Sequence, residues 1–496
     1  MARLKEEEEM VIMFPFMAQG HIIPFLKLAL QIEQRYGYKI IFLNTPLNIK
    51  KLHSCLPPNS SITLTELPFC STDHGLPPET ENTDTLPFPL IPDFLEASLC
   101  LKPSFDQLIR DLTNQQGHPP LCIIADMFFS WSVDIAHEFN IFHSILITGS
   151  AYGTGVYYSL WMNLPQCKTE SDQFGLPDFP EVSMIHRSQL PSNLKNSNGS
   201  DSWAKFLQKY LPLWFKSDGI LLNTVEGLDQ TGLKYFRKKI SGRPVWPVLV
   251  SCICPAKISG VDPENCMEWL DNHVENSVLY VSFGSQSTLS GSQMMELAMG
   301  LEASGKSFIW VVRPPTGIKA TEEFRSEWLP EGYESRLKEQ NRGLLVRKWA
   351  PQLEILSHKS TCAFLSHCGW NSVLESLSHG VPILGWPMIA EQTYNAKLLE
   401  EEIGVCIEVG RGITCDIKHE NIKTAIQLVM GGSQKGVEMR TKACKIKEMI
   451  KDSLRIDNDF KGSSAKSIDG FINAATSMRK DNNKFRGNNE NSRLCI

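Results

Sequence analysis

The sequence predicts an α/β protein made of two doubly wound domains in succession, each with a parallel sheet. Three observations lead to this prediction. Short apolar runs alternate with helical segments, the alternation occurs in both halves of the chain, and an irregular stretch with prolines lies between the halves. A length of 496 residues agrees with two domains, because one hydrophobic core rarely organises so long a chain.

The first half is assigned to a domain of residues 1–249, in which strands and helices alternate. Its first apolar run, residues 11–16, is typical of a strand that is covered on both faces. A tight loop at residues 17–21 precedes a helix that has Pro24 in its first turn and ends near Gly37. Further strands are predicted at residues 39–43 and 121–124, the latter followed by a helix from about Ser130.

An irregular stretch at residues 246–263 contains three prolines, and its part from 250 to 263 is interpreted as the interdomain linker. The second domain is expected at residues 264–456. Residues 457–478 are expected to pack back onto the first domain, and the polar, Asn-rich end at residues 479–496 to be disordered. The predicted helices of the second half are 264–270 and 290–303, and its strands are 277–282 and 307–312.

The composition excludes several classes of function. A net charge of -6 provides no basic surface for nucleic acid. No uninterrupted apolar run reaches the roughly 18 residues of a membrane-spanning helix, and the acidic N-terminus lacks the apolar stretch of an export signal. Fourteen cysteines without regular spacing suggest reduced thiols. We therefore expect a cytoplasmic protein without a transmembrane segment, and we take it to be a monomer.

Two motifs that suggest metal binding are set aside, and no metal site is predicted. Cys252-x-Cys254 with Cys266 has neither the spacing nor the fourth ligand of a zinc site. Asp457-Asn458-Asp459 matches the Asp-x-Asp pattern of metal-dependent transferases, but no apolar strand precedes it, so we interpret it as a solvated turn. The chain also lacks a G-x-G-x-x-G fingerprint after a strand, a G-x-S-x-G elbow and a Walker A loop.

The segment of residues 349–392 is the most informative part of the sequence. Residues 362–365 form a short apolar strand, a turn ends at Gly369, and residues 370–378 form a helix. This order places free backbone N–H groups and the positive end of a helix dipole at the sheet edge, which suits a diphosphate. The side chains in the turn and the first helical turn that can add hydrogen bonds are His367, Asn371 and Ser372.

The same segment offers groups for a nucleoside and a sugar. Glu375 lies one helical turn after Asn371, where a carboxylate suits the two hydroxyls of a ribose. Trp349 offers a flat face for a uracil ring, with Ala350 and Gln352 placed around it. The groups suited to sugar hydroxyls are those of Glu391 and Gln392.

These 44 residues resemble the signature segment of the plant secondary-product UDP-glycosyltransferases, a family with the GT-B fold. The resemblance rests on W-A-P-Q at the start, H-C-G-W-N-S in the middle with Glu375 three residues later, and E-Q at the end. It extends over essentially the whole chain, through F-P-F-x-x-x-G-H-x-x-P at the front, Leu222-Asn223-Thr224, and V-S-F-G-S at residues 281–285. It implies two Rossmann-like domains that face each other across a cleft.

The resemblance also implies the roles of individual residues. Trp349 would stack on uracil and Glu375 would hold the ribose. The diphosphate contacts would come from Ser285, His367, Asn371 and Ser372, and the sugar contacts from Trp370, Glu391 and Gln392. A final Gln in this segment accompanies glucose more often than galactose in the family, which favours UDP-glucose as the co-substrate. The implied mechanism is direct displacement with inversion, without a metal or another cofactor.

A glycosyl transfer to an alcohol needs a base, because a neutral hydroxyl is a poor nucleophile. His21 follows the first strand and Asp126 follows the strand at residues 121–124, so both lie at the carboxyl edge of one sheet. Imidazole can accept the hydroxyl proton, and a carboxylate can fix its tautomer. In the family pattern the two match the catalytic pair. The loop departs from that pattern at Gln19 and Gly20, where many members carry small hydroxyl residues that contact phosphate.

The acceptor pocket is expected to have aromatic and sulfur-containing walls, formed by Phe16, Met17, Met127, Phe128, Trp161 and Met388. Such walls suit flat or apolar aglycones of several shapes. The sequence thus predicts a glucosyltransferase that uses flavonoid, phenylpropanoid or terpenoid hydroxyls. The alternatives are the same scaffold with UDP-galactose or a UDP-pentose, a non-catalytic small-molecule binder, and a dehydrogenase with twin nucleotide-binding sheets.

Overall fold

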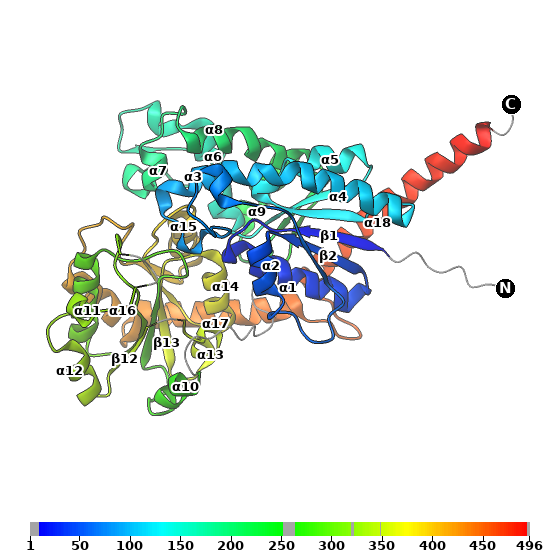
Figure 1. Cartoon of the computed structure of the whole chain (residues 1–496). Coiled ribbons are helices and arrows are strands. Elements are labelled where there is room, and N and C mark those ends of the chain that lie inside the picture. Colours follow the sequence, from blue (N-terminus) through cyan, green and yellow to red (C-terminus); the bar gives the residue numbers. More distant parts are fainter. Residues whose placement is uncertain (1–8, 251–262, 319–321, 348, 494–496) are drawn as a thin grey trace.

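The computed structural model describes residues 9–250, 263–318, 322–347 and 349–493. Two parallel sheets lie in two adjoining lobes, with helices packed around each of them (Figure 1). The predicted arrangement of two successive α/β domains is confirmed.

The first sheet has seven parallel strands in the order β3-β2-β1-β4-β5-β8-β9. The order reverses between β1 and β4, which pair from Val11 opposite Cys122 to Phe14 opposite Ala125. Ligands of open α/β sheets bind at such a reversal, outside the carboxyl ends of the strands. The strands are β1 (Met10–Phe14), β2 (Lys39–Asn44), β3 (Thr63–Glu66), β4 (Cys122–Asp126), β5 (Phe142–Ile147), β8 (Gly219–Leu222) and β9 (Val245–Pro247). A separate antiparallel pair consists of β6 (Gln173–Phe174) and β7 (Ile185–His186).

The second sheet has six parallel strands in the order β12-β11-β10-β13-β14-β15. Its order reverses between β10 and β13, whose last residues, Ser282 and Ser366, stand opposite each other. The strands are β10 (Val278–Ser282), β11 (Ser307–Val311), β12 (Gly343–Val346), β13 (Thr361–Ser366), β14 (Ile383–Gly385) and β15 (Cys406–Glu408).

Helices connect the strands of both sheets. Those of the first domain are α1 (Gln19–Tyr36), α2 (Pro46–Leu52), α3 (Ile91–Ala97), α4 (Leu101–Gln116), α5 (Ser132–Glu138), α6 (Ala151–Asn163), α7 (Ser192–Lys195), α8 (Ser202–Tyr210) and α9 (Gln230–Lys239). Those that follow are α10 (Pro263–Asp271), α11 (Gly291–Ser304), α12 (Tyr333–Glu339), α13 (Gln352–Ser357), α14 (Trp370–Ser378), α15 (Gln392–Lys397), α16 (His419–Met430), α17 (Gln434–Leu454) and α18 (Ser463–Arg493).

Helix α1 begins earlier than the sequence predicted. It starts at Gln19, so that His21 lies in the first helical turn and not in a loop. Pro24 therefore stands inside the helix, where it has no N–H to donate to the carbonyl of Gly20 four residues before it. The predicted end is confirmed, because Gly37 caps the helix in the left-handed conformation with a φ of 67°.

Two stretches expected to be irregular are ordered. Strand β9 occupies part of residues 246–263, while residues 251–262 of the expected linker lie outside the described residues. Helix α18 continues as far as Arg493, through most of the end that was expected to be disordered. The beginning of that end is tied to the first domain, because Arg479 pairs with Glu9 at 2.9 Å and Asn482 donates to the carbonyl of Asn140 at 3.3 Å.

The first part of α18 packs on the first domain, although it follows the second domain in sequence. Phe471 contacts the rings of Phe142 and Trp246, with centroid distances of 5.9 and 5.4 Å. Arg35 of α1 forms an ion pair of 2.6 Å with Asp469. The chain therefore crosses back and fastens both domains together, as Figure 1 shows for the red helix beside the blue strands.

The hydrophobic cores of the two domains merge on one side of the molecule. The cluster around β1, β4 and α6 also contains Trp370, Val373 and Leu377 of α14 and Tyr394 of α15. Helices α14 and α15 thus lie at the boundary between the lobes (Figure 1). Their amino ends are held by apolar contacts from both domains.

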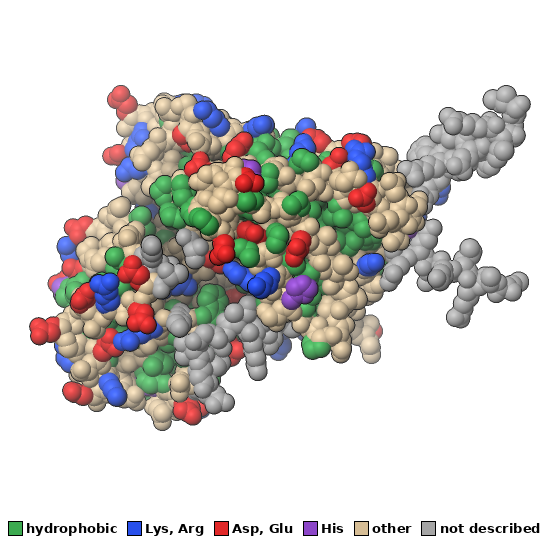
Figure 2. Space-filling model, in the orientation of Figure 1, with side chains coloured by type: hydrophobic (Ala, Val, Ile, Leu, Met, Phe, Trp, Pro, Cys, Tyr) green, Lys and Arg blue, Asp and Glu red, His purple; other side chains and the backbone are tan. Residues whose placement is uncertain are grey.

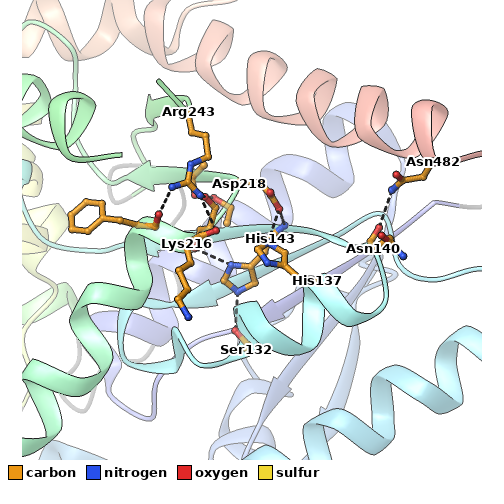
Figure 3. Close-up of polar contacts among 12 residues, drawn as sticks. Ser132, His137, Asn140, His143, Lys216, Asp218, Arg243 and Asn482 are labelled. Atoms are coloured by element: carbon orange, nitrogen blue, oxygen red, sulfur yellow. Dashed lines mark hydrogen bonds and ion pairs between the residues drawn. The ribbon is translucent and has the colours of Figure 1, made fainter. Parts of the chain in front are cut away.

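A polar cluster occupies the amino edge of the first sheet, opposite the edge where β1 and β4 end (Figure 3). His143 is fully buried there, with Nε2 at 2.9 Å from Ser132 Oγ and Nδ1 at 3.0 Å from Ser217 Oγ. Asp218 accepts the backbone N–H of His143 at 2.8 Å and lies 3.6 Å from His137 Nε2. Burial lowers the pKa of His143 to about 3, so the imidazole is neutral.

Acidic and basic side chains are interspersed over the face drawn in Figure 2, without a large area of one sign. The described part of the chain contains no helix with the length and apolar character needed to cross a bilayer.

Candidate active site

His21 and Asp126 meet at the point where the order of the first sheet reverses. His21 comes from the first turn of α1, directly after β1, and Asp126 is the last residue of β4. Their side chains form a hydrogen bond of 2.8 Å between His21 Nδ1 and Asp126 Oδ2. The other carboxylate oxygen accepts the backbone N–H of Phe128 at 3.0 Å. Asp126 is fully buried, whereas the side chain of His21 is 19% exposed, so part of the imidazole is accessible.

The electrostatic surroundings of His21 favour its protonated form. Burial alone would lower the pKa of the imidazole, but the negative charge and hydrogen bond of Asp126, with the charge of Glu391, raise it above its ordinary value. Because Nδ1 faces Asp126, the neutral ring carries its proton there and presents a lone pair at Nε2. This arrangement can accept a proton and then stabilise the resulting cation.

The turn after β13 lies beside the loop after β10, where the order of the second sheet reverses. A Cβ atom added to Gly284 would be 2.6 Å from the His367 ring, and one added to Gly369 would be 2.4 Å from His367 Nε2. Both positions therefore require glycine so that the backbones can enclose the imidazole. Gly284 also has a φ of 73°, which glycine adopts without strain.

Helix α14 begins directly after this turn, with Gly369 as its N-cap, as predicted. Its first N–H groups and the positive end of its dipole lie at this turn. Burial and, to a smaller extent, the charge of Arg313 lower the pKa of His367 to about 4. His367 is therefore neutral at pH 7 and supplies a hydrogen bond but no charge.

The residues expected around a nucleoside are linked to one another. Trp349 is 43% exposed, so one face of its indole is available, and Ala350 beside it is buried. Gln352 donates to Ser372 Oγ at 3.1 Å and to Glu375 Oε2 at 2.7 Å. Burial raises the pKa of Glu375, and the charge of Lys27 on α1 and the hydrogen bond from Gln352 counter this shift.

Glu391 and Gln392 begin α15 after a backbone turn in which Ala390 has a φ of 52°. The side-chain oxygen of Gln392 accepts the N–H groups of Met388 and Ile389, both at 3.0 Å, so this residue also holds the turn. Burial raises the pKa of Glu391, and the charge of His21 counters this shift, which places the carboxylate near the base.

Contacts between the domains fix the base opposite α14. Asn371 donates through Nδ2 to the carbonyl of Gly20 at 2.9 Å, and that carbonyl lacks a helical partner because of Pro24. Asn223, after β8, donates to Asn371 Oδ1 at 3.2 Å, and its carbonyl accepts the indole N–H of Trp370 at 2.6 Å.

The structure thus gives Asn371 and Trp370 contacts that the sequence did not predict. The indole of Trp370 is 3% exposed and its N–H is bound to Asn223, so the ring N–H is not available to a sugar. The carbonyl oxygen and the amide group of Asn371 both reach the first domain. A further interdomain bond joins Ser150 Oγ to Asn395 Oδ1 at 2.6 Å.

The expected acceptor residues fall into two groups. Phe16 and Phe128 surround the base, with ring centroids 5.7 and 5.6 Å from that of His21 and 5.0 Å from each other. Phe16 is itself buried in the core, with 2% of its surface exposed, and the four others are also buried in the hydrophobic cores: Met17, Met127, Trp161 and Met388. Trp161 is fully buried against Tyr157, so it belongs to the core from which the wall is built.

The described residues of the two metal-like motifs lie apart from other ligand-type side chains. Asp457 and its neighbours are exposed in the connection between α17 and α18, where Asp457 pairs with Arg455 at 2.9 Å. Cys266 is buried in α10, and Cys252 and Cys254 lie outside the described residues. Among the residues that the structure describes, no three His, Cys, Asp or Glu side chains are grouped as metal ligands.

Sequence reasoning missed four residues at the domain boundary, although a common signal was available. Asn223 and Arg313 each follow an apolar strand directly or within two residues, and Asp126 is the last residue of such a strand. A polar residue at that position lies at the carboxyl edge of a parallel sheet. Ser150 and Asp84 lie in connecting segments, and their contacts with the second domain leave no comparable signal.

Comparisons with known proteins agree over nearly the whole chain. The family described as "UDP-glucoronosyl and UDP-glucosyl transferase" matches residues 243–443. UDP-glycosyltransferase 92A1 of Arabidopsis thaliana is 46% identical over 97% of this chain and 100% of its own length. Crocetin glucosyltransferase 3 of Crocus sativus is 43% identical over 85% of this chain and 90% of its own.

Solved structures show the same two-domain fold. UGT73P12 of Glycyrrhiza uralensis, complexed with glycyrrhetinic acid 3-O-monoglucuronide, has a TM-score of 0.81 and 29% identity, covering 98% of this chain and 99% of its own. UGT2 of Phytolacca americana, complexed with UDP-2fluoro-glucose and pterostilbene, has a TM-score of 0.75 and 28% identity, covering 94% of this chain and 100% of its own.

Proposed function

The chain belongs to the plant UDP-glycosyltransferases, GT-B enzymes that include UDP-glucosyltransferases, and on this premise we propose that it glucosylates a hydroxyl of a small lipophilic metabolite with inversion. The observation that carries the proposal is the His21–Asp126 hydrogen bond of 2.8 Å, together with the bond by which Asn371, at the start of α14, reaches the Gly20 carbonyl beside His21. In this proposal the base on the first domain acts on a donor whose diphosphate binds the second domain.

In the proposed reaction, His21 Nε2 accepts the proton of the acceptor hydroxyl as its oxygen attacks the anomeric carbon of the glucose. The bond from oxygen to carbon forms while the bond from that carbon to the UDP oxygen breaks. Asp126 stabilises the imidazolium through Nδ1. A single displacement on the α-linked donor gives a β-glucoside, and no covalent intermediate forms.

The donor is proposed to bind along α14. Uracil would stack on the exposed face of Trp349, and the ribose would bind Glu375, to which Gln352 donates a hydrogen bond of 2.7 Å. The diphosphate would meet the amino end of α14 and the loop of Ser285 without a metal ion. Glu391 and the amide group of Gln392 are the proposed contacts for glucose.

The acceptor is proposed to be a flavonoid, phenylpropanoid or terpenoid. Phe16 and Phe128 form an aromatic wall beside the base, which suits flat apolar rings. Similar proteins carry the names scopoletin glucosyltransferase and anthocyanin 3'-O-beta-glucosyltransferase, and a structural neighbour binds pterostilbene. The described cysteines are unpaired, which agrees with the proposed cytoplasmic location.

The test uses purified protein with UDP-glucose, UDP-galactose or UDP-xylose and a panel of such aglycones. We expect the product from UDP-glucose to gain the mass of one hexose. In its NMR spectrum, the coupling constant of the anomeric proton should identify a β-glucoside. His21→Ala should lower kcat by about 100-fold or more with unchanged UDP affinity, while the exposed control His53→Ala stays active. UDP binding without transfer to any acceptor would instead identify a small-molecule binder, and preferred use of UDP-galactose or UDP-xylose would contradict the donor assignment.

A further inference from the structure

A buried arginine lies next to the turn assigned to the diphosphate. Arg313 stands two residues after the end of β11, at the carboxyl edge of the second sheet. Its Nη1 atom donates to the carbonyl of Ser285. It also lines a small cavity together with Ser282, Gly284 and Ser287, the loop that follows β10. The guanidinium is thus bonded to the backbone of this loop.

The counter-charge of Arg313 comes from the other domain. Asp84 belongs to a short segment of the first domain that reaches the second, where Gln286 donates to the hydroxyl of Thr83. Burial raises the pKa of Asp84, and Lys51 and Arg313 counter this shift by their charges. One carboxylate oxygen, Oδ1, is buried and makes no hydrogen bond of good geometry within the described residues. Asp84 and Arg313 form no direct ion pair among the described residues, so the carboxylate acts on the guanidinium only through its charge.

The loop also contains a buried polar group without a partner. Ser287 Oγ is buried and has no hydrogen-bond partner in the described part of the chain. A buried polar atom without a partner usually marks the place of a water molecule or a ligand. The cavity that Ser287 and Arg313 line has a volume of about 20 Å³, which is room for one water molecule, so a diphosphate would bind on the loop outside this cavity.

A departing UDP needs more positive charge than the other groups supply. The diphosphate leaves with two or three negative charges, and the amino end of one helix offers the equivalent of about half a charge. His367 is neutral at pH 7, because burial and the charge of Arg313 hold its pKa at about 4. The effect of Arg313 on His367 places the guanidinium within electrostatic reach of the turn.

We propose that Arg313 supplies the positive charge that binds and stabilises the donor diphosphate, and that Asp84 of the first domain is its counter-ion until the donor binds. This inference rests on the proposed use of a UDP-sugar. Asp84 is a positioning residue, since it acts through Arg313.

Calorimetric titrations of the whole protein with uridine, UMP and UDP separate the charge of Arg313 from the rest of the site. Arg313→Met should weaken UDP binding by about 10-fold or more and leave uridine binding unchanged, because only the phosphates meet the guanidinium. Arg313→Lys should keep UDP affinity within about 5-fold of wild type. The control Arg336→Met removes an arginine of the same domain that pairs with Glu302 on the far side, and should change neither affinity.

Asp84→Asn provides a second test that does not depend on the folding of the Met variant. It should bind UDP at least as tightly as wild type, because the diphosphate no longer competes with a carboxylate for Arg313. The inference would be overturned if Arg313→Met bound UDP as tightly as wild type, or if it lost affinity for uridine and UDP equally. It would also be overturned if Asp84→Asn bound UDP about 10-fold more weakly than wild type. A wild-type protein that binds neither UDP nor UMP would instead contradict the proposed donor.

Discussion

Replacing His143 with glutamine should make the stability of the protein less sensitive to acid, although the residue lies far from the base. In the folded chain His143 is fully buried and neutral, with a pKa of about 3 against 6.5 when exposed. Below pH 6.5 the unfolded chain therefore binds a proton at this site that the folded chain does not bind. The free energy of unfolding decreases as the pH is lowered, until about pH 3. Both ring nitrogens are held by serine hydroxyls, so the ring cannot turn toward water (Figure 3).

The magnitude follows from the two pKa values. Between pH 7.5 and pH 5 the unfolded chain takes up nearly one proton at this site and the folded chain almost none, which costs about 2 kcal/mol of the free energy of unfolding. His137 acts in the opposite direction, because the hydrogen bond to Asp218 raises its pKa and its stabilisation grows as the pH falls. Asp229 also acts in the opposite direction, since burial raises its pKa to about 7. The contribution of His143 is therefore best measured as a difference between variants.

Urea titrations at pH 7.5 and pH 5, followed by circular dichroism, would provide this difference. Wild type should lose about 2 kcal/mol more than His143→Gln on acidification, because glutamine does not titrate. His53→Gln, which removes an exposed histidine, should behave like wild type. If the glutamine variant loses as much stability as wild type, His143 is not the buried neutral group that the geometry indicates.

Three further predictions concern the cleft. The kcat/KM should fall about tenfold per pH unit below an apparent pKa above 6.5, because Asp126 and Glu391 raise the pKa of His21 and only neutral imidazole accepts a proton. Asp126→Asn should move this acid limb to lower pH in a profile from pH 5 to 9. An unchanged limb would show that Asp126 does not raise the pKa of His21. Gly369→Ala places a methyl 2.4 Å from His367 Nε2 and should raise the KM for UDP-glucose by about 10-fold. The control Gly291→Ala meets no atom within 4 Å, and equal KM values in both variants would refute the packing argument. Saturating EDTA should leave initial rates within about twofold, since a helix terminus is assigned to the diphosphate, and a strict requirement for added Mg²⁺ or Mn²⁺ would overturn that assignment.

Local pattern was enough to predict the elements that present the site. Helix α14 has the predicted bounds, and His21 and Asp126 meet because each stands at the carboxyl end of a strand on either side of a sheet reversal. Such features depend on where the apolar strands lie and in which direction the chain runs, and both can be read from the sequence. The start of α1 was wrong because a proline inside a helix is normally a sign of its first turn.

The contacts between the domains could not be predicted in the same way. The bond from Trp370 to Asn223, and the effect of the Arg313 charge on Asp84, depend on how one sheet is set against the other. That placement is decided by the packing of α14 and α15 on the first domain and by the return of α18. No residue pattern within either domain encodes it.

The proline inside α1 has a consequence for anyone who recombines such domains. Because Pro24 has no backbone N–H, the Gly20 carbonyl has no helical donor and accepts a hydrogen bond from Asn371 instead. A chimera that joins the first domain of one enzyme to the second domain of another keeps this hydrogen bond only if the first domain contains the proline and the second contains the asparagine. Pro24 and Asn371 are therefore a compatibility pair for domain exchange, to be transferred or redesigned together even though 347 positions separate them in the chain.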